Sequence, residues 1–405
     1  MRDITHLPEK TGISQLDEVR YSRLKSGGNE IPGSLKVALV HDWFVNYAGS
    51  ERCVESFTNI FPDADVFSLV DYLNHEDRKI ILKGRNSKTS FIQNLPLSKT
   101  KFRYYLPLFP QAIEQFNLNN YDLVISSSHA VAKGVLTNTY QTHICYCHTP
   151  MRYAWNNYHQ YINVSGFQKG IKGLLTASAL QYLRNWDFQS ATRPDYYIAN
   201  SKHIAKQIKK RYNREATVIY PPVDTDKFEV NNNKEEFYLT VSRMVPNKRV
   251  DIVVNAFSKL KDKKLVVIGD GPLKKQLKKF ATNNIEFIDP LPFEDLKIYM
   301  QKAKGFISAA EEDFGITVVE AMAAGTPVIA FSRGGTGESV IDNKTGVLFH
   351  EPSIESLIEG IENFESKIDS FDSYLIKEYS NKFNRNHFES IMKEFIVERL
   401  IENNN

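Results

Sequence analysis

Short apolar runs recur along the first half of the chain, and each one ends in polar residues. They are "KVALVHDW" (36–43), "DLVISSS" (122–128), "THICYCHTP" (142–150), "DYYIANS" (195–201) and "ATVIYPPVD" (216–224). Such runs are typical of buried parallel strands. The stretches between them have helical patterns, and strands that alternate with helices indicate a doubly wound parallel sheet.

The same alternation restarts after a polar, Asn-rich segment. The strands expected in this second half are "EFYLTVSR", "KKLVVIGDGP", "IEFIDPL", "GFISAA" and "TPVIAFS". We therefore predict an α/β protein with two Rossmann-like doubly wound domains facing a central cleft. Ligands of open α/β sheets bind at the carboxyl ends of the strands, so we expect a ligand in that cleft.

The pattern also predicts the domain boundaries. Residues 1–35 are polar without a clear period and are interpreted as a flexible extension. The first domain is expected over 36–224, a linker over 225–236 and the second domain over 237–378. Residues 379–405 have apolar positions at helical spacing, which suits a C-terminal helix that could cross back to the first domain.

Composition narrows the class of protein. The chain has 405 residues, of which 42% are hydrophobic and 24% charged, and its net charge is +3. That charge is too small to indicate a nucleic-acid-binding protein. Three cysteines, no secretory signal and no long apolar stretch favour a cytoplasmic protein whose only membrane contact would be peripheral.

The stretch "EEDFGITVVEAMAAGTPVIA" (311–330) places Glu320 inside an otherwise apolar run. We expect a strand to end near residue 310 and a helix to start near Gly315, with Glu312 in the loop between them. A helix N-terminus favours a phosphate, here near Gly315, Ile316 and Thr317. Two carboxylates at this spacing suit a nucleotide-linked polyol, although an ordinary helix with an acidic first turn fits the stretch equally well.

Two further motifs favour the first interpretation. "VSRMVPNKRVD" (241–251) places Arg243 and Lys248 in a loop after a strand, where cations can neutralise a diphosphate. Another strand ends in Gly269-Asp270-Gly271 before a helix, a pattern that is weak on its own.

From residue 36 onward the chain resembles glycosyltransferase family 4, whose members are retaining enzymes of the GT-B fold. The resemblance rests on "SRMVPNKRVD", "VIGDGPL", "EEDFGITVVEAMAAGTPVIA" and "RGGTGESVIDNKTGVLF" in the second domain. The first domain adds "HDWFVNYAGSERC", "YCHTPMRYAW", "YYIANSKHIAKQI" and "VIYPPVDTDKF". These look most like bacterial mannosyltransferases of surface polysaccharide or O-antigen synthesis.

The resemblance implies a role for each matching residue. Arg243 and Lys248 would bind the donor diphosphate, while Glu312 and His148 would contact the donor sugar. These four form the expected catalytic set. The expected donor-binding set, in which Glu320 would hold the ribose, comprises Gly49, Gly269, Gly271, Gly315, Ile316, Thr317 and Glu320. The family often has two glycines where this chain has Gly49-Ser50.

No metal or other cofactor is expected. The triplets Asp63–Asp65 and Asp224–Asp226 match the Asp-x-Asp pattern of metal-dependent glycosyltransferases, but neither context supplies further ligands. Cys145 and Cys147 alternate as a strand does, and no second ligand pair follows at zinc spacing.

The resemblance implies transfer of a hexose, with mannose from GDP-mannose favoured, to a glycan or polyprenyl-linked saccharide. A UDP-sugar donor and a non-catalytic GT-B partner subunit are the alternatives. Two basic amphipathic segments, 95–116 and 167–186, either rest on an anionic membrane at the inner face of the cell membrane or pack as ordinary helices.

Overall fold

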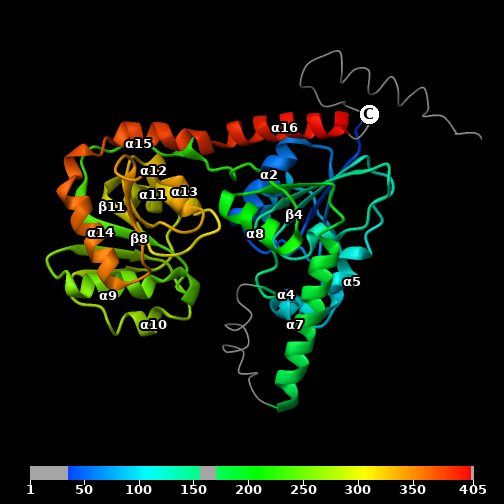
Figure 1. Cartoon of the computed structure of the whole chain (residues 1–405), viewed down its shortest axis with the longest axis horizontal. Coiled ribbons are helices and arrows are strands. Elements are labelled where there is room, and N and C mark those ends of the chain that lie inside the picture. Colours follow the sequence, from blue (N-terminus) through cyan, green and yellow to red (C-terminus); the bar gives the residue numbers. More distant parts are fainter. Residues whose placement is uncertain (1–34, 156–169, 403–405) are drawn as a thin grey trace, which may run out of the picture.

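The structure, a computed structural model, describes residues 35–155 and 170–402 and divides them into two α/β domains joined at a cleft (Figure 1). Each domain contains one parallel sheet. In the first sheet the strand order is β3-β2-β1-β4-β5-β6-β7, and in the second it is β10-β9-β8-β11-β12-β13. The α/β fold predicted from the sequence is confirmed.

The first sheet is formed by seven strands that pair in parallel. They are β1 (Val37–His41), β2 (Asp65–Ser68), β3 (Lys88–Thr89), β4 (Leu123–Ser128), β5 (Thr142–Cys147), β6 (Tyr196–Ala199) and β7 (Thr217–Val218). The helices of this domain are α2 (Gly49–Ile60), α3 (His75–Leu82), α4 (Ser98–Lys101), α5 (Phe109–Glu114), α7 (Gly170–Ser190) and α8 (Lys202–Tyr212).

The second sheet follows the segment that was expected as a linker, and its first strand includes the last two residues of that segment. The strands are β8 (Glu235–Val241), β9 (Lys264–Ile268), β10 (Ile285–Ile288), β11 (Ala303–Ser308), β12 (Val328–Phe331) and β13 (Gly346–Phe349). The helices are α9 (Val250–Lys259), α10 (Lys274–Leu277), α11 (Phe293–Lys302), α12 (Ile316–Ala323), α13 (Thr336–Ser339), α14 (Ile354–Ser366) and α15 (Ser373–Ser380).

Both faces of each sheet are buried, which explains the unbroken apolar runs. Alternate residues of a strand point to opposite faces. In β1, Val37 and Leu39 belong to one apolar cluster, and Ala38 and Val40 belong to another on the opposite face. Strand β9 divides in the same way.

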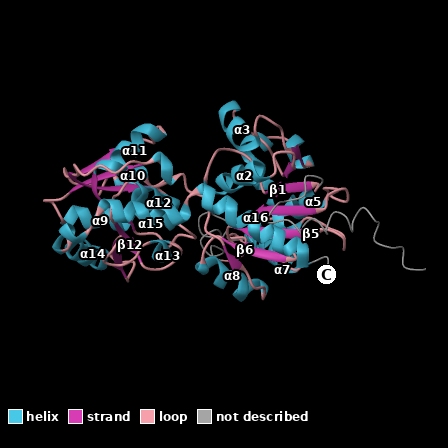
Figure 2. Cartoon of the chain, turned by 90° about the horizontal axis from the view of Figure 1, so that it is seen from above, coloured by secondary structure: helices cyan, strands magenta, loops and turns pink. Residues whose placement is uncertain are grey.

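The last helix, α16 (Arg385–Glu402), leaves the second domain and packs against the first (Figures 1 and 2). Its residues Phe388, Met392 and Ile396 are buried in the same cluster as Leu39 of β1. At the start of the helix, Arg385 donates to Asp224 in the connection between the domains and forms an ion pair with Glu55 of α2. These contacts fasten the first domain to the second beside the cleft.

Candidate functional site

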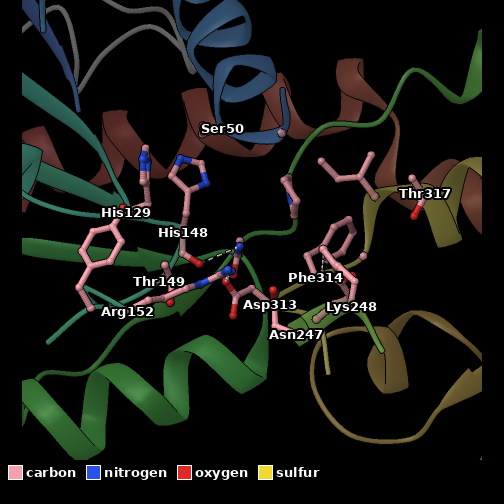
Figure 3. A pocket seen from close by; sticks show the side chains of 17 residues that line it. Ser50, His129, His148, Thr149, Arg152, Asn247, Lys248, Asp313, Phe314 and Thr317 are labelled. Carbon is pink, nitrogen blue, oxygen red and sulfur yellow. Dashed lines mark hydrogen bonds and ion pairs between the residues drawn. The ribbon is translucent and has the colours of Figure 1, made fainter. Parts of the chain in front are cut away.

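A cavity of about 560 Å³ lies in the cleft between the carboxyl ends of the two sheets (Figure 3). The first domain supplies loop residues after β1, β4 and β5, and the second supplies the loops after β8 and β11. The lining residues are Gly49, Ser50, His129, His148, Thr149, Arg152, Tyr153, Asn200, Pro221, Asn247, Lys248, Glu312, Asp313, Phe314, Gly315, Ile316 and Thr317.

Two helices begin at this cavity from opposite domains. Helix α2 starts at Gly49 and α12 starts at Ile316, and the residue that precedes each helix makes no side-chain capping bond. The two ends approach closely, because a Cβ atom on Gly49 would lie 2.9 Å from Cδ1 of Ile316. Gly315 has a φ of +91°, which glycine adopts without the strain of a side chain. The N-terminal N–H groups of a helix can bind an anion, and two helices present this end to the cavity.

Lys248 and Glu312 face each other across the second-domain side of the cavity. The Nζ atom of Lys248 donates to both carboxylate oxygens of Glu312, at 2.6 Å each. Lys248 ends a short 3-10 turn after β8, and Glu312 follows β11. Both side chains are partly exposed, so each of them can also reach a ligand in the cavity.

Glu320 is buried on α12 and is not among the residues that line the cavity. Its partner comes from the first domain, because Nη2 of Arg52 on α2 donates to Glu320 Oε1 at 2.7 Å. The Nη1 atom of Arg52 is buried without a hydrogen-bond partner. A charge among apolar residues is therefore compensated by an ion pair that joins α12 to α2.

A second ion pair between the domains lies on the other side of the cavity. Arg152, in the loop after β5, pairs with Asp313, in the loop after β11. The nearby carboxylates of Asp313 and Glu312 raise the pKa of Arg152, so the arginine stays charged.

Two histidines, His129 and His148, lie in the first-domain wall of the cavity. The Nε2 atom of His148 lies 2.8 Å from Oγ of Ser127, and burial holds the pKa of His148 well below its usual range. His129 lies beside Asp42, with 3.1 Å between Nδ1 and the carboxylate, and burial also lowers the pKa of His129. The fully buried Asp42 accepts four backbone N–H groups from residues 129–132, which fixes the loop that carries His129.

The structure brings together most of the residues that the sequence singled out. Gly49, His148, Lys248, Glu312, Gly315, Ile316 and Thr317 line one cavity. Arg243, Gly269, Gly271 and Glu320 do not line it.

Arg243 is exposed after β8. The two glycines after β9 are needed by packing, because a Cβ on Gly269 would lie 2.1 Å from the carbonyl oxygen of Ser242 and one on Gly271 would lie 2.4 Å from that of Met244.

Several functional candidates escaped the sequence reasoning. Arg152 and Tyr153 lie within the quoted motif "YCHTPMRYAW", and Ser50 and Arg52 lie within "YAGSERC". Their closeness in sequence to His148 and Gly49, which line the cavity, could have identified them. His129 and Asn200 follow strands but carry no distinctive local pattern.

A second cavity of about 570 Å³ adjoins the first and shares Arg152, Asn247, Glu312 and Asp313 with it. Basic side chains dominate its walls. They are Arg152, His203, Lys210, Arg211, Arg249 and Arg333, opposed by Glu311, Glu312 and Asp313.

The Asp-x-Asp triplets lie outside the cleft, and cations already occupy two of their carboxylates. Asp65 pairs with Lys88, and Asp224 pairs with Arg385 and Lys227. Within residues 35–155 and 170–402, no group of three or more His, Cys, Asp or Glu side chains is arranged to hold a metal ion. None of the helices in this described part is long and apolar enough to cross a membrane.

Two family models match consecutive parts of the chain. The model for "Glycosyltransferase Family 4" matches residues 65–227, and the model for "Glycosyl transferases group 1" matches residues 223–382. Together they cover residues 65–382, which include the whole second sheet and every residue that lines the cavity in the second domain, while β1 of the first sheet lies outside them.

Two curated relatives match about half of the chain or less. An uncharacterized glycosyltransferase of Methanocaldococcus jannaschii is 33% identical over 48% of this chain and 57% of its own. A GDP-mannose-dependent alpha-(1-6)-phosphatidylinositol monomannoside mannosyltransferase of Mycolicibacterium smegmatis is 28% identical over 35% of this chain and 44% of its own. The chain thus spans about half the length of these relatives.

Among solved structures, Anabaena HepE in complex with UDP-glucose has the same fold. It superimposes with a TM-score of 0.65 over 89% of this chain and 99% of its own, at 17% identity. This likeness and the family models identify the two-domain arrangement as GT-B.

Proposed function

Because the chain belongs to glycosyltransferase family 4 and has the GT-B fold, we propose that it transfers a hexose from a nucleotide sugar to a saccharide hydroxyl, with retention of the anomeric configuration. The observation that carries this proposal is the convergence of Lys248 and the N-termini of α2 and α12 on one cavity. A diphosphate leaving group needs this kind of preorganised positive charge.

The ion pairs at the cavity suit such a reaction. Lys248 donates to Glu312 in the structure and would turn to the diphosphate when the donor binds, which would free Glu312 to accept hydrogen bonds from the sugar. Glu320 would exchange Arg52 for the ribose hydroxyls in the same way. The acceptor's proton would pass to the departing phosphate, and domain closure would exclude water.

For the donor, we propose GDP-mannose. The mycobacterial relative is described as GDP-mannose-dependent, and the motifs of the first domain resemble mannosyltransferases. The test is thermal denaturation with GDP-mannose, GDP-fucose, UDP-glucose, UDP-galactose and UDP-N-acetylglucosamine, with GDP and UDP as controls. A ligand that binds only the folded state raises the melting temperature. We expect GDP and GDP-mannose to raise the melting temperature. If only uridine nucleotides raise it, the donor is a UDP-sugar, and the proposed hexosyl transfer still holds.

For the acceptor, we propose a glycan or lipid-linked saccharide that carries an acidic group. The second cavity borders the first, and its walls hold more basic than acidic side chains. An acceptor that extends into it would place its anionic part beside Arg333 and Lys210 and its hydroxyl near Glu312. Inhibition of the transfer reaction by inorganic pyrophosphate tests this placement. If pyrophosphate binds in the second cavity, it should inhibit the Arg333→Glu variant less strongly than the wild type.

We also propose that the first domain rests on an anionic membrane. Lys99, Lys101 and Arg103 are exposed next to the exposed apolar side chains of Leu97 and Tyr104. Helix α7 contacts the same segment and exposes Leu174 and Leu175. The segment 167–186 begins outside the described residues. Flotation with vesicles of phosphatidylglycerol and phosphatidylcholine at low salt checks this, and a protein that stays unbound would contradict it.

A further inference from the structure

A line of polar side chains runs from the interior of the first domain to the cavity wall. The carboxylate of Glu51 on α2 lies 3.5 Å from Nε2 of His41, the last residue of β1. The Nδ1 atom of His41 lies 3.1 Å from both the carbonyl oxygen and Oγ of Ser127 on β4. Ser127 Oγ lies 2.8 Å from Nε2 of His148. Glu51, His41 and Ser127 are at most 4% exposed, so the protein alone determines their hydrogen bonds.

The positions of the protons follow from the groups that cannot donate. A backbone carbonyl oxygen only accepts, so Nδ1 of His41 carries a hydrogen and points it at the carbonyl of Ser127. A carboxylate also only accepts, and Glu51 faces the other ring nitrogen.

The direction of the next bond is then determined. With a hydrogen already on Nδ1 of His41, Ser127 cannot donate its hydroxyl hydrogen there. The remaining acceptor is Nε2 of His148, at 2.8 Å. His148 is neutral because burial lowers its pKa, so a ring that accepts at Nε2 carries its one hydrogen on Nδ1. No described residue hydrogen-bonds this Nδ1, and His148 lines the cavity.

We infer that Glu51, His41 and Ser127 are positioning residues that hold His148 as the Nδ1-protonated tautomer, so that it presents a hydrogen-bond donor to the cavity. Given the proposed function, the partner of that N–H is a hydroxyl oxygen of the transferred sugar. His148 then binds the sugar through a neutral hydrogen bond and has no free basic nitrogen with which to accept the acceptor's proton.

Strands β4 and β5 contain a second Ser–His pair, which does not reach the cavity. Ser126 Oγ lies 2.8 Å from Nε2 of His143, and both residues are fully buried. Because successive residues of β4 point to opposite faces of the sheet, Ser126→Ala removes a Ser–His hydrogen bond of the same length on the other face. It is the control for Ser127→Ala.

The direct test is two-dimensional long-range ¹H–¹⁵N NMR of the ¹⁵N-histidine-labelled full chain, with His148 assigned by its absence in His148→Gln. We expect the neutral Nδ1–H pattern in the wild type and in Ser127→Thr, which retains the hydroxyl. Ser127→Ala should give a mixture of tautomers, and Ser126→Ala should leave the His148 signal unchanged. An Nε2–H or doubly protonated His148 in the wild type would overturn the inference, as would a tautomer that is indifferent to Ser127→Ala.

The kinetic readout is slow hydrolysis of the nucleotide sugar that the thermal panel selects, which needs no acceptor. Ser127→Ala should lower the hydrolysis rate at saturating donor roughly tenfold, which corresponds to the loss of about one hydrogen bond. The rise in melting temperature caused by the nucleoside diphosphate should be the same as in the wild type. Ser127→Thr should recover most of the rate. A loss no larger than that of Ser126→Ala would contradict the positioning role. If no nucleotide or nucleotide sugar of the thermal panel stabilises the wild type, the proposed function fails, while the NMR result still decides the tautomer.

Discussion

The two walls of the cleft are built on different electrostatic principles. The second-domain wall carries charges that neutralise one another in pairs, such as Lys248 with Glu312, and these side chains are partly exposed. The first-domain wall is lined by His129 and His148, whose pKa values are lowered by burial, so both are neutral. Figure 3 shows the histidines on one side of the cavity and Lys248 on the other.

The difference suggests a division of labour. An exposed ion pair costs little to break, so Lys248 can exchange Glu312 for a diphosphate at a small energetic cost. A buried neutral histidine cannot rearrange its hydrogen bonds so easily, because each unsatisfied group there is expensive. The second domain therefore suits a charged leaving group, and the first suits recognition of an uncharged sugar.

Removing the cation of the charged wall should have the largest effect. Lys248→Ala leaves the diphosphate without its side-chain cation, and we expect turnover to fall by ~10²-fold or more, as for other preorganised stabilising groups. Steady-state kinetics with the selected donor measures it. Lys344→Ala is the control, since Lys344 is exposed in the turn before β13. Turnover at the wild-type level in Lys248→Ala would remove Lys248 from the mechanism.

The two walls also differ in how far the sequence predicted them. The charged wall belongs to contiguous motifs, so the positions of Lys248, Glu312 and Gly315 at strand ends were predicted and the structure brings them into one cavity. The partner of Glu320 was not predicted, because Arg52 is 268 residues away and the contact depends on how the domains meet. His148 was predicted from its motif. His41 and Ser127 were not, because they lie near His148 only as a result of the order in which strands β1, β4 and β5 pair.

The ion pair between Arg52 and Glu320 tests the link between the walls. Arg52→Ala leaves a buried carboxylate without its partner, and we expect the free energy of unfolding to fall by about 2 kcal/mol. The double variant Arg52→Ala/Glu320→Gln should recover part of this loss, because no unpaired charge remains.

Urea denaturation monitored by circular dichroism gives these values. Lys259→Ala breaks the exposed pair with Glu355 and should leave the free energy of unfolding close to the wild-type value. An Arg52→Ala protein as stable as Lys259→Ala would mean that solvent already screens Glu320.

The histidines of the first domain predict a dependence of stability on pH. Burial lowers the pKa of His143 to about 3 and also lowers those of His129 and His148. The unfolded chain binds protons at these residues below pH ~6.5 while the folded protein does not, so stability falls as the pH falls. At pH ~5.5 His143, whose folded-state pKa is about 3, should cost about 1.4 kcal/mol relative to neutral pH.

Urea midpoints measured from about pH 7.5 to about pH 5.5 test this, because the carboxylates Asp42 and Glu51 have lowered pKa values and stay ionised in that window. His143→Gln should show a shallower slope than the wild type. His75→Gln, at an exposed position on α3, should keep the wild-type slope. A stability that does not change over this window would mean that the buried histidines are charged in the folded protein.

The smallest effect is expected at Arg152, the charged residue of the first-domain wall. Its ion pair with Asp313 is 41% exposed on the arginine side, so Arg152→Gln should change the free energy of unfolding by less than about 1 kcal/mol. Salt screens exposed charges, and at about 1 M NaCl the difference from the wild type should vanish. Thermal denaturation of both proteins at low and high salt measures this. A loss as large as that of Arg52→Ala, and insensitive to salt, would mean that Arg152 behaves as a buried charge and that the contrast between the two walls does not hold there.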